Sequence, residues 1–244
     1  MACWLTIEQL TEVAFGTQPV VMANEAHDGM RRCVRTRRVG LRLVRAAHEL
    51  GVRDLAMEAL PAPAPGEPES WTELPPVEGG YLAQPDMREL TSTALGRGWR
   101  LWSHEALTPP ELLEHPEQLL TMEFTNRRER EQALNLAEVA RRVPMLLVWC
   151  GNGHATRQVV SDWVPMGYQF VRITGRRPYV IDQTVTVNWN DENDYMPDGA
   201  LEWLDGELAP YGGTAAVRHD DAPEQLLQRD ADAFVLSLHN QLEE

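Results

Sequence analysis

Hydrophobic positions over residues 1–155 follow two patterns, a helical spacing in long segments and continuous apolar runs in short ones. The helical spacing predicts amphipathic helices at 6–15, 30–50, 86–95 and 123–142. The apolar runs predict strands at 20–23, 54–58, 99–102 and 144–150. Because strands alternate with helices, we expect an α/β fold with a mostly parallel central sheet and helices on both faces.

Residues at the ends of these segments support the assignment. Thr6 and Asp86 are suitable N-caps, and Gly51 can end the helix over 30–50. Residues 61–80 are rich in proline, glycine and glutamate, which predicts a long loop.

The last third of the chain, about 165–244, is less regular. Strand-like alternation occurs at 169–173 and 179–187, residues 188–198 are acidic and polar, and 233–236 predicts a final strand. Neither an internal repeat nor a linker divides the sequence. We therefore expect residues 1–244 to form a single α/β domain with a less regular C-terminal third.

Charge excludes several classes of partner and mechanism. The chain has 22 basic residues against 37 acidic ones, for a formal charge of −15. This is the wrong sign for wrapping nucleic acid or an anionic membrane, so we expect neither as a partner. All the basic residues are arginines, which excludes Schiff-base lysine chemistry and a Walker lysine. A small-molecule or peptide-like substrate is the partner we expect.

Cysteine usage and the N-terminus indicate the compartment. The odd set Cys3, Cys33 and Cys150 has no C-x-x-C spacing, which fits a reducing environment. The first residues lack a basic segment, and the longest apolar run, 145–150, is too short to span a bilayer. We expect a cytoplasmic protein without signal peptide or anchor.

Ionisable residues follow all four predicted strands of the first part of the chain. They are Glu25 and His27, Glu58, His104 and Glu105, and His154. The carboxyl ends of parallel strands share one edge of the sheet, so these side chains are expected to line one site. A carboxylate can fix the tautomer of a histidine and stabilise its imidazolium, which makes His27 the expected general base.

A glycine-rich segment follows the fourth strand. Gly151-Asn152-Gly153-His154 lets the backbone approach a ligand, and we expect a helix to open at Ala155 and Asn152 to contact substrate. A dinucleotide fingerprint would need a glycine where the chain has Thr156, so a Rossmann site is not favoured.

The ordered motifs resemble a known superfamily. Asn-Glu-Ala-His-Asp at 24–28, Leu-Ala-Met-Glu at 55–58, an Arg-Glu-rich helix and Cys-Gly-Asn-Gly-His-Ala at 150–155 are similar to the erythromycin-esterase/ChaN-like superfamily, which includes haem-binding uptake and Tiki-related members. Its usual pattern is Gly-Glu-x-His, a strand ending in Glu, Arg-Asp-x-x-Met-Ala-x-Asn on a helix, and Gly-x-Gly-His. Asn24 departs from this pattern by replacing its first glycine.

The resemblance implies roles for individual residues. Glu25 and His27 match the first pair, Glu58 the strand-end glutamate and His154 the last histidine. Arg128 matches the helix arginine, with Arg130 as the alternative. In that scheme His27 is the base, the two glutamates orient it, and His154 and Arg128 stabilise the developing oxyanion.

The resemblance further implies a hydrolase or acyl-transfer enzyme acting on a small or natural-product-like ester, lactone or amide, without a required metal or other cofactor. Natural-product biosynthesis is the expected setting. The alternative is a non-catalytic or metal-dependent binding protein that holds haem, a divalent metal or a partner peptide in the same pocket.

Three other sequence features bear on the expected site and its chemistry. A Gly-x-Ser-x-Gly elbow is absent, which disfavours a serine hydrolase. Cys150 ends a strand before a glycine-rich turn, yet its apolar context predicts a buried thiol rather than a nucleophile. The arginine-rich helix 30–50 is expected to present a solvated face, with Arg31 and Arg32 as the alternative clamp for a substrate anion.

Overall fold

The computed structural model describes residues 3–25, 30–58, 60–76, 81–114, 116–151, 153–184 and 204–237. The helices are α1 (Ile7–Thr17), α2 (Met30–Glu49), α3 (Pro85–Gly96), α4 (Pro110–Leu113), α5 (Met122–Arg142), α6 (Met166–Thr174) and α7 (Asp205–Leu208). The strands are β1 (Trp4–Leu5), β2 (Val20–Glu25), β3 (Asp54–Met57), β4 (Ser70–Trp71), β5 (Arg100–Ser103), β6 (Leu146–Gly151), β7 (Tyr179–Asp182), β8 (Thr214–Arg218) and β9 (Ala233–Ser237).

The described strands form one sheet of nine, in the order β1-β8-β9-β7-β2-β6-β3-β5-β4. The pairs from β9 to β5 are parallel. Antiparallel pairs lie outside them, with β8 on β9, β1 on β8 and β4 on β5, so each edge of the sheet ends in a strand of two residues. The predicted mostly parallel α/β fold is confirmed.

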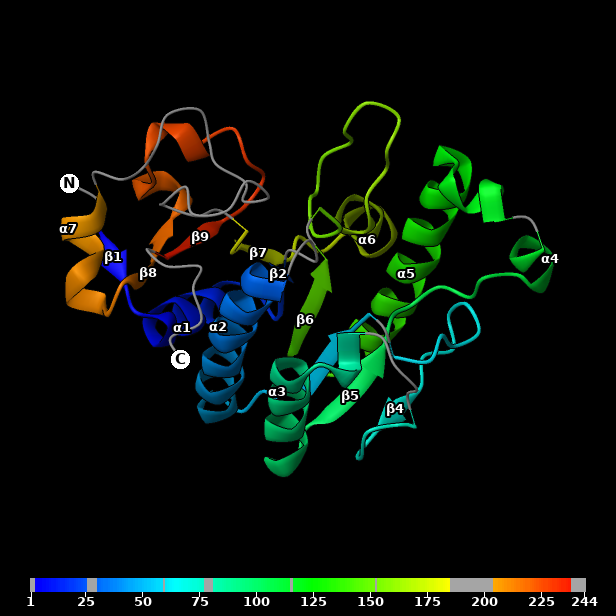
Figure 1. Cartoon of the computed structure of the whole chain (residues 1–244), viewed down its shortest axis with the longest axis horizontal. Helices are drawn as coiled ribbons and strands as arrows, with labels where there is room; N and C mark the ends of the chain where they lie inside the picture. Colours follow the sequence, from blue (N-terminus) through cyan, green and yellow to red (C-terminus); the bar gives the residue numbers. More distant parts are fainter. Residues whose placement is uncertain are drawn as a thin grey trace.

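Helices cover both faces of the sheet (Figure 1). Alternate residues of β2 point to opposite sides, as the pleat requires. Val21 and Ala23 pack in a core with α1, α2 and α3, and Val20 and Met22 pack in a second core with α5 and α6. Two buried cores, one on each face, therefore fix the sheet between its helix layers.

Local signals explain where the first helices begin. Thr6 caps α1 in a capping box with Gln9. The N-cap of α3 is Gln84, followed by Pro85, so the prediction of Asp86 as the cap was wrong. Proline at this position lacks only an N–H that the first turn leaves unpaired.

The C-terminal third differs most from expectation. The strand predicted at 169–173 is wrong, because these residues belong to α6, which buries Met166, Gly167 and Phe170 on one face and ends at Gly175 with φ 66°. The strand predicted at 233–236 corresponds to β9. Of the strand predicted at 179–187, β7 covers Tyr179–Asp182, Gln183 and Thr184 lie beyond its end, and residues 185–187 lie outside the described residues. Residues 188–198 lie outside the described residues.

The segment after β6 is also different from the prediction. Residues 153–155 form a turn rather than the start of a helix at Ala155. The next helix is α6, after a loop of residues 153–165. None of the described helices is long and apolar enough to cross a membrane.

Candidate functional site

Three strand ends and one helix meet at the carboxyl edge of the parallel strands. Glu58 follows β3, His104 and Glu105 follow β5, and His154 follows β6. The helix α5 adds Arg128, which lies near Glu58, and Glu129, which lies against His154. The predicted convergence at one edge thus includes residues from β3, β5 and β6.

His154 lies between two carboxylates. Its Nδ1 is 2.7 Å from Oε1 of Glu129, an ion-pair distance, although the angle does not suit a hydrogen bond. Its Nε2 is 3.9 Å from Oε2 of Glu58. Burial opposes the charged ring, but Glu129 and then Glu58 raise the pKa of His154 above its ordinary value of 6.5. The two buried carboxylates therefore favour the charged form of the ring.

Arg128 lies at the rim of this cluster. Its Nε and Nη2 donate hydrogen bonds of 3.0 Å each to the two carboxylate oxygens of Glu105. Nη2 also lies 3.9 Å from Oε2 of Glu58. The other candidate arginine, Arg130, is exposed on the same helix. Arg128 is therefore the arginine that α5 brings to the site.

Glu105 is mainly a partner of α5. It accepts from Arg128 and from Nε2 of Gln132, while its carbonyl oxygen accepts from Nδ2 of Asn135. Burial opposes its charge, but Arg128 outweighs this and lowers the pKa of Glu105. Its contacts orient Arg128.

His104 has an unusual environment. The residue is completely buried, and neither ring nitrogen has a hydrogen-bond partner. Burial lowers the pKa of His104 to about 4, against the opposing effect of Glu58 and Glu105. At neutral pH it is an uncharged ring close to the charged groups of the site.

Glu25 is held from the α2 side. It is fully buried and receives hydrogen bonds of 3.0 and 3.1 Å from Arg37 and one of 2.9 Å from the indole of Trp149. Arg35 is also buried and donates to the carbonyl oxygen of Gln183. The expectation that the arginines of 30–50 form a solvated face was therefore wrong for Arg35 and Arg37, which tie α2 to the sheet.

Four predicted site residues lie wholly or partly outside the described residues. His27 and Asn152 lie outside the described residues. The backbone of Arg31 and Arg32 is helical in α2, while their side chains lie outside the described part of the structure.

The pair Arg128-Glu129 matches the Arg-Asp of the superfamily's helix motif, but the sequence alone predicts no role for Glu129 in the site. This glutamate is buried in α5, where it also accepts from Nε1 of Trp163 at 3.1 Å and from the backbone N–H of Met166 at 2.6 Å. The signal was a carboxylate in the helix stripe that contains Gln132, Ala133 and Leu136. A carboxylate in a buried stripe requires a partner, which here is the loop that carries His154.

Neither a low-pKa thiol nor a group of three metal-ligating side chains is found in the described part of the chain. Cys150 is buried, and burial together with nearby carboxylates raises its pKa well above 9.0, so it lacks the low-pKa environment of a nucleophilic thiol. Within the described ranges, no three histidine, cysteine, aspartate or glutamate side chains are grouped to hold a metal.

Comparison with known proteins supports the fold. No protein-family model matches the chain, and no curated protein matches its sequence. A Bacillus cereus protein of known crystal structure is similar with a TM-score of 0.60 and 11% identity, over 96% of this chain and 92% of that one. A structure described as bacterial protein toxins has a TM-score of 0.43 and 13% identity, over 78% of this chain and 38% of that one. The type III effector HopBA1 has a TM-score of 0.43 and 12% identity, over 98% and 97%. The likeness to the Bacillus cereus protein shows a shared α/β fold.

Proposed function

We propose that this chain is a hydrolase or acyl-transfer enzyme acting on a small ester, lactone or amide. One observation carries the proposal: His154 has Nδ1 against Glu129 and Nε2 directed toward Glu58, beside Arg128. A carboxylate on one ring nitrogen orients the ring and leaves the other nitrogen for proton transfer. The resemblance to the erythromycin-esterase/ChaN-like superfamily supports the same reaction class.

The proposed roles follow from charge. Water loses a proton to a base and attacks the acyl carbon, whose carbonyl oxygen becomes negative. The imidazolium of His154 and the guanidinium of Arg128 stabilise that oxygen. When the carbonyl re-forms, the bond from the acyl carbon to the leaving oxygen or nitrogen breaks, and His154 gives its proton to the departing alcohol or amine. His27 remains the proposed base. Glu58 supports the charge on His154.

No metal or other cofactor enters the proposed reaction, and the proposed setting is cytoplasmic natural-product metabolism. The alternative of a binding protein for haem, a divalent metal or a peptide makes a different prediction, namely tight binding without turnover.

Substitution of His154 and Glu129 tests the enzyme proposal. A panel of p-nitrophenyl esters and simple lactones identifies a substrate, and turnover and melting temperature are then measured for each variant. His154→Gln should lower turnover by about two to four orders of magnitude, because it removes the proton donor. Glu129→Gln should also lower turnover and should move the descending limb of the pH–rate profile to lower pH, since Glu129 raises the pKa of His154.

Arg130→Gln is the matched control, because Arg130 is exposed on the same helix. It should leave turnover unchanged. Near-normal turnover in a folded His154→Gln protein would refute the role of His154, and a wild-type protein that binds panel members without turnover would favour the binding alternative.

A further inference from the structure

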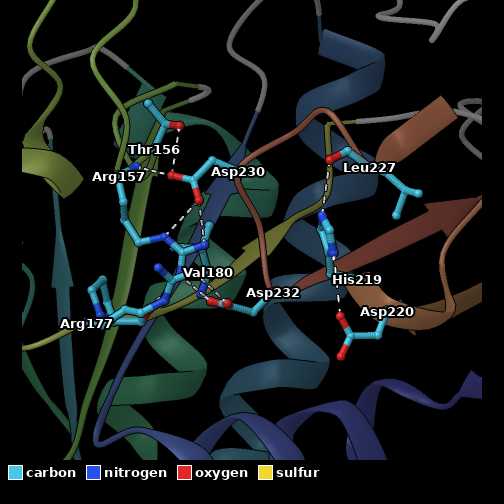
Figure 2. A network of polar contacts seen from close by, with 10 residues as sticks. Thr156, Arg157, Arg177, Val180, His219, Asp220, Leu227, Asp230 and Asp232 are labelled. Carbon is cyan, nitrogen blue, oxygen red and sulfur yellow. Dashed lines mark hydrogen bonds and ion pairs between the residues drawn. The ribbon is translucent and has the colours of Figure 1, made fainter. Parts of the chain in front are cut away.

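The loop of residues 153–165 carries His154 and is joined to a distant part of the chain. Residues 228–232, which lead into β9, lie beside it, and Arg157 bridges the two segments (Figure 2). Nothing in the roles proposed above uses this bridge.

Arg157 is almost completely enclosed, with 4% of its side chain exposed. Its Nε and Nη2 donate to Oδ1 of Asp230 at 3.1 and 2.7 Å, and its backbone N–H donates to Oδ2 of the same carboxylate. Its Nη1 donates to Oδ2 of Asp232 at 2.6 Å and to the carbonyl oxygen of Pro178 at 3.1 Å. A buried arginine with this many charge-assisted bonds has little freedom to move.

The anchor is close to His154 along the chain. The turn between them is closed by hydrogen bonds from the N–H of His154 to Gly151 and from the N–H of Thr156 to Gly153, at 3.1 and 3.0 Å. The carbonyl oxygen of His154 accepts from the N–H of Gly167 at 2.7 Å. These hydrogen bonds restrict the turn between the two residues, so the position of Arg157 restricts that of His154.

The far end of the loop has a separate attachment. The side chain of Asn126 on α5 donates to the carbonyl oxygen of Asp162 and accepts from the N–H of Val164. Glu129 accepts from Trp163 and Met166. The α5 helix therefore holds residues 162–166, whereas Arg157 holds the part of the loop next to His154.

We propose that Arg157 is a positioning residue for His154: its bonds to Asp230 and Asp232 fix the loop so that the imidazole stays against Glu129. The inference rests on the proposed function, in which His154 is the proton donor. The same two segments wall a hollow of about 250 Å³, with Gly153, Thr156 and Trp163 on one side and Gln228 and Asp230 on the other. The bridge consequently also sets the width of that hollow.

The test measures the ring of His154 without a substrate. Protein labelled with ¹³C-histidine is titrated by NMR, and the His154 signal is assigned by its loss in His154→Gln. In Arg157→Met the pKa of His154 should move down toward 6.5, because the ring spends less time against Glu129. Among the residues that the structure describes, the charged and titratable groups near the ring are Glu129, Glu58, Arg128 and His104, and the variant changes none of them.

Arg177→Met is the matched control. Arg177 lies 3.4 Å from Asp232 at the edge of the same network, but its side chain is 62% exposed and lies outside the loop. It should leave the His154 titration unchanged, and Arg157→Lys, which keeps the charge but not the planar fork, should give an intermediate shift.

A folded Arg157→Met protein with an unchanged His154 titration would overturn the proposal, even if its melting temperature fell. If Arg157→Met does not fold, the His154 titration is measured in Asp230→Asn, in which Asp232 still binds the arginine. An unchanged titration in that variant would likewise overturn the proposal. Failure of the proposed function is a separate result, because it appears as absent turnover and leaves the titration unaffected.

Discussion

His104 and His154 lie in one cluster, and their surroundings move their pKa values in opposite directions. Burial dominates for His104, whose ring nitrogens have no hydrogen-bond partner, whereas for His154 the carboxylates of Glu129 and Glu58 together outweigh burial. Two histidines whose pKa values are shifted in opposite directions can supply a neutral and a charged imidazole within one site. In this arrangement His154 is suited to donate a proton, and His104 stays neutral.

His104 should make the protein sensitive to acid. Its pKa is about 4 in the folded chain, against 6.5 for the unfolded reference, so the unfolded state binds the extra proton between those values. Stability should therefore fall as pH decreases from about 6.5 to about 4, by roughly 3 kcal/mol from this residue.

Urea denaturation at several pH values measures this effect. His104→Phe should flatten the loss of stability across that pH range relative to wild type, because the replacement cannot be protonated. Equal slopes for the two folded proteins would show that the folded-state pKa of His104 is not lowered.

At the scale of elements, α2 packs closely on the sheet because it carries a glycine at the contact. A Cβ at Gly40 would lie 2.4 Å from the ring of Trp149 and 2.7 Å from Leu90. Trp149 is fully buried and its indole donates to Glu25, so the ring has little room to move.

Gly40→Ala should therefore lower the free energy of unfolding by about 1–3 kcal/mol, despite the better helix propensity of alanine. Gly96→Ala in α3 is the control, since nothing lies within 4 Å of its added Cβ, and it should be neutral or slightly stabilising. Chemical denaturation of both variants measures the difference. A stabilised Gly40→Ala protein would mean that α2 can move away from Trp149.

The elements that sequence predicts best are the buried parallel strands. The predicted 54–58 and 99–102 lie within one residue of β3 and β5, because each strand contains a short buried apolar run, Leu55–Met57 in β3 and Leu101–Trp102 in β5. The segment 169–173 was misread since Phe170, Val171 and Ile173 do not distinguish a strand from a helix, and packing of α6 on α5 decides it. Strand β8 was not predicted, because its sequence, Thr-Ala-Ala-Val-Arg, lacks the bulky side chains that are typical of strands.

The same limit applies to the candidate site. Strand ends indicated Glu58, His104, Glu105 and His154 because parallel strands share a carboxyl edge. The contact of Glu129 with His154, and that of Arg157 with Asp230, join residues far apart in the sequence. No short-range spacing encodes such contacts, which arise only when the helices and loops pack.

At the scale of the whole molecule, the C-terminal third belongs to the same sheet as the rest. Strand β9 pairs with β7, which pairs with β2, and Phe234 is buried in the core that contains Val20 and Leu136. A shared core and continuous hydrogen bonding favour one cooperative unit.

Hydrogen exchange in increasing denaturant should therefore show the amides of β2, β6 and β9 opening in one global event. Mass spectrometry of peptides from these strands provides the measurement. Exchange of β9 at a clearly lower free energy, while β2 and β6 remain protected, would show that the C-terminal strands unfold separately.

The two-residue strands at both edges of the sheet have a consequence for self-association. An exposed edge is a template on which another chain can add a strand, and long flat edges lead to fibres and precipitation. Here β1 and β4 offer only Trp4–Leu5 and Ser70–Trp71 for such addition, far less than the six-residue strands β2 and β6 inside the sheet. The six-residue apolar strands β2 and β6 are thereby kept from adding strands of another chain for as long as the edges remain in place.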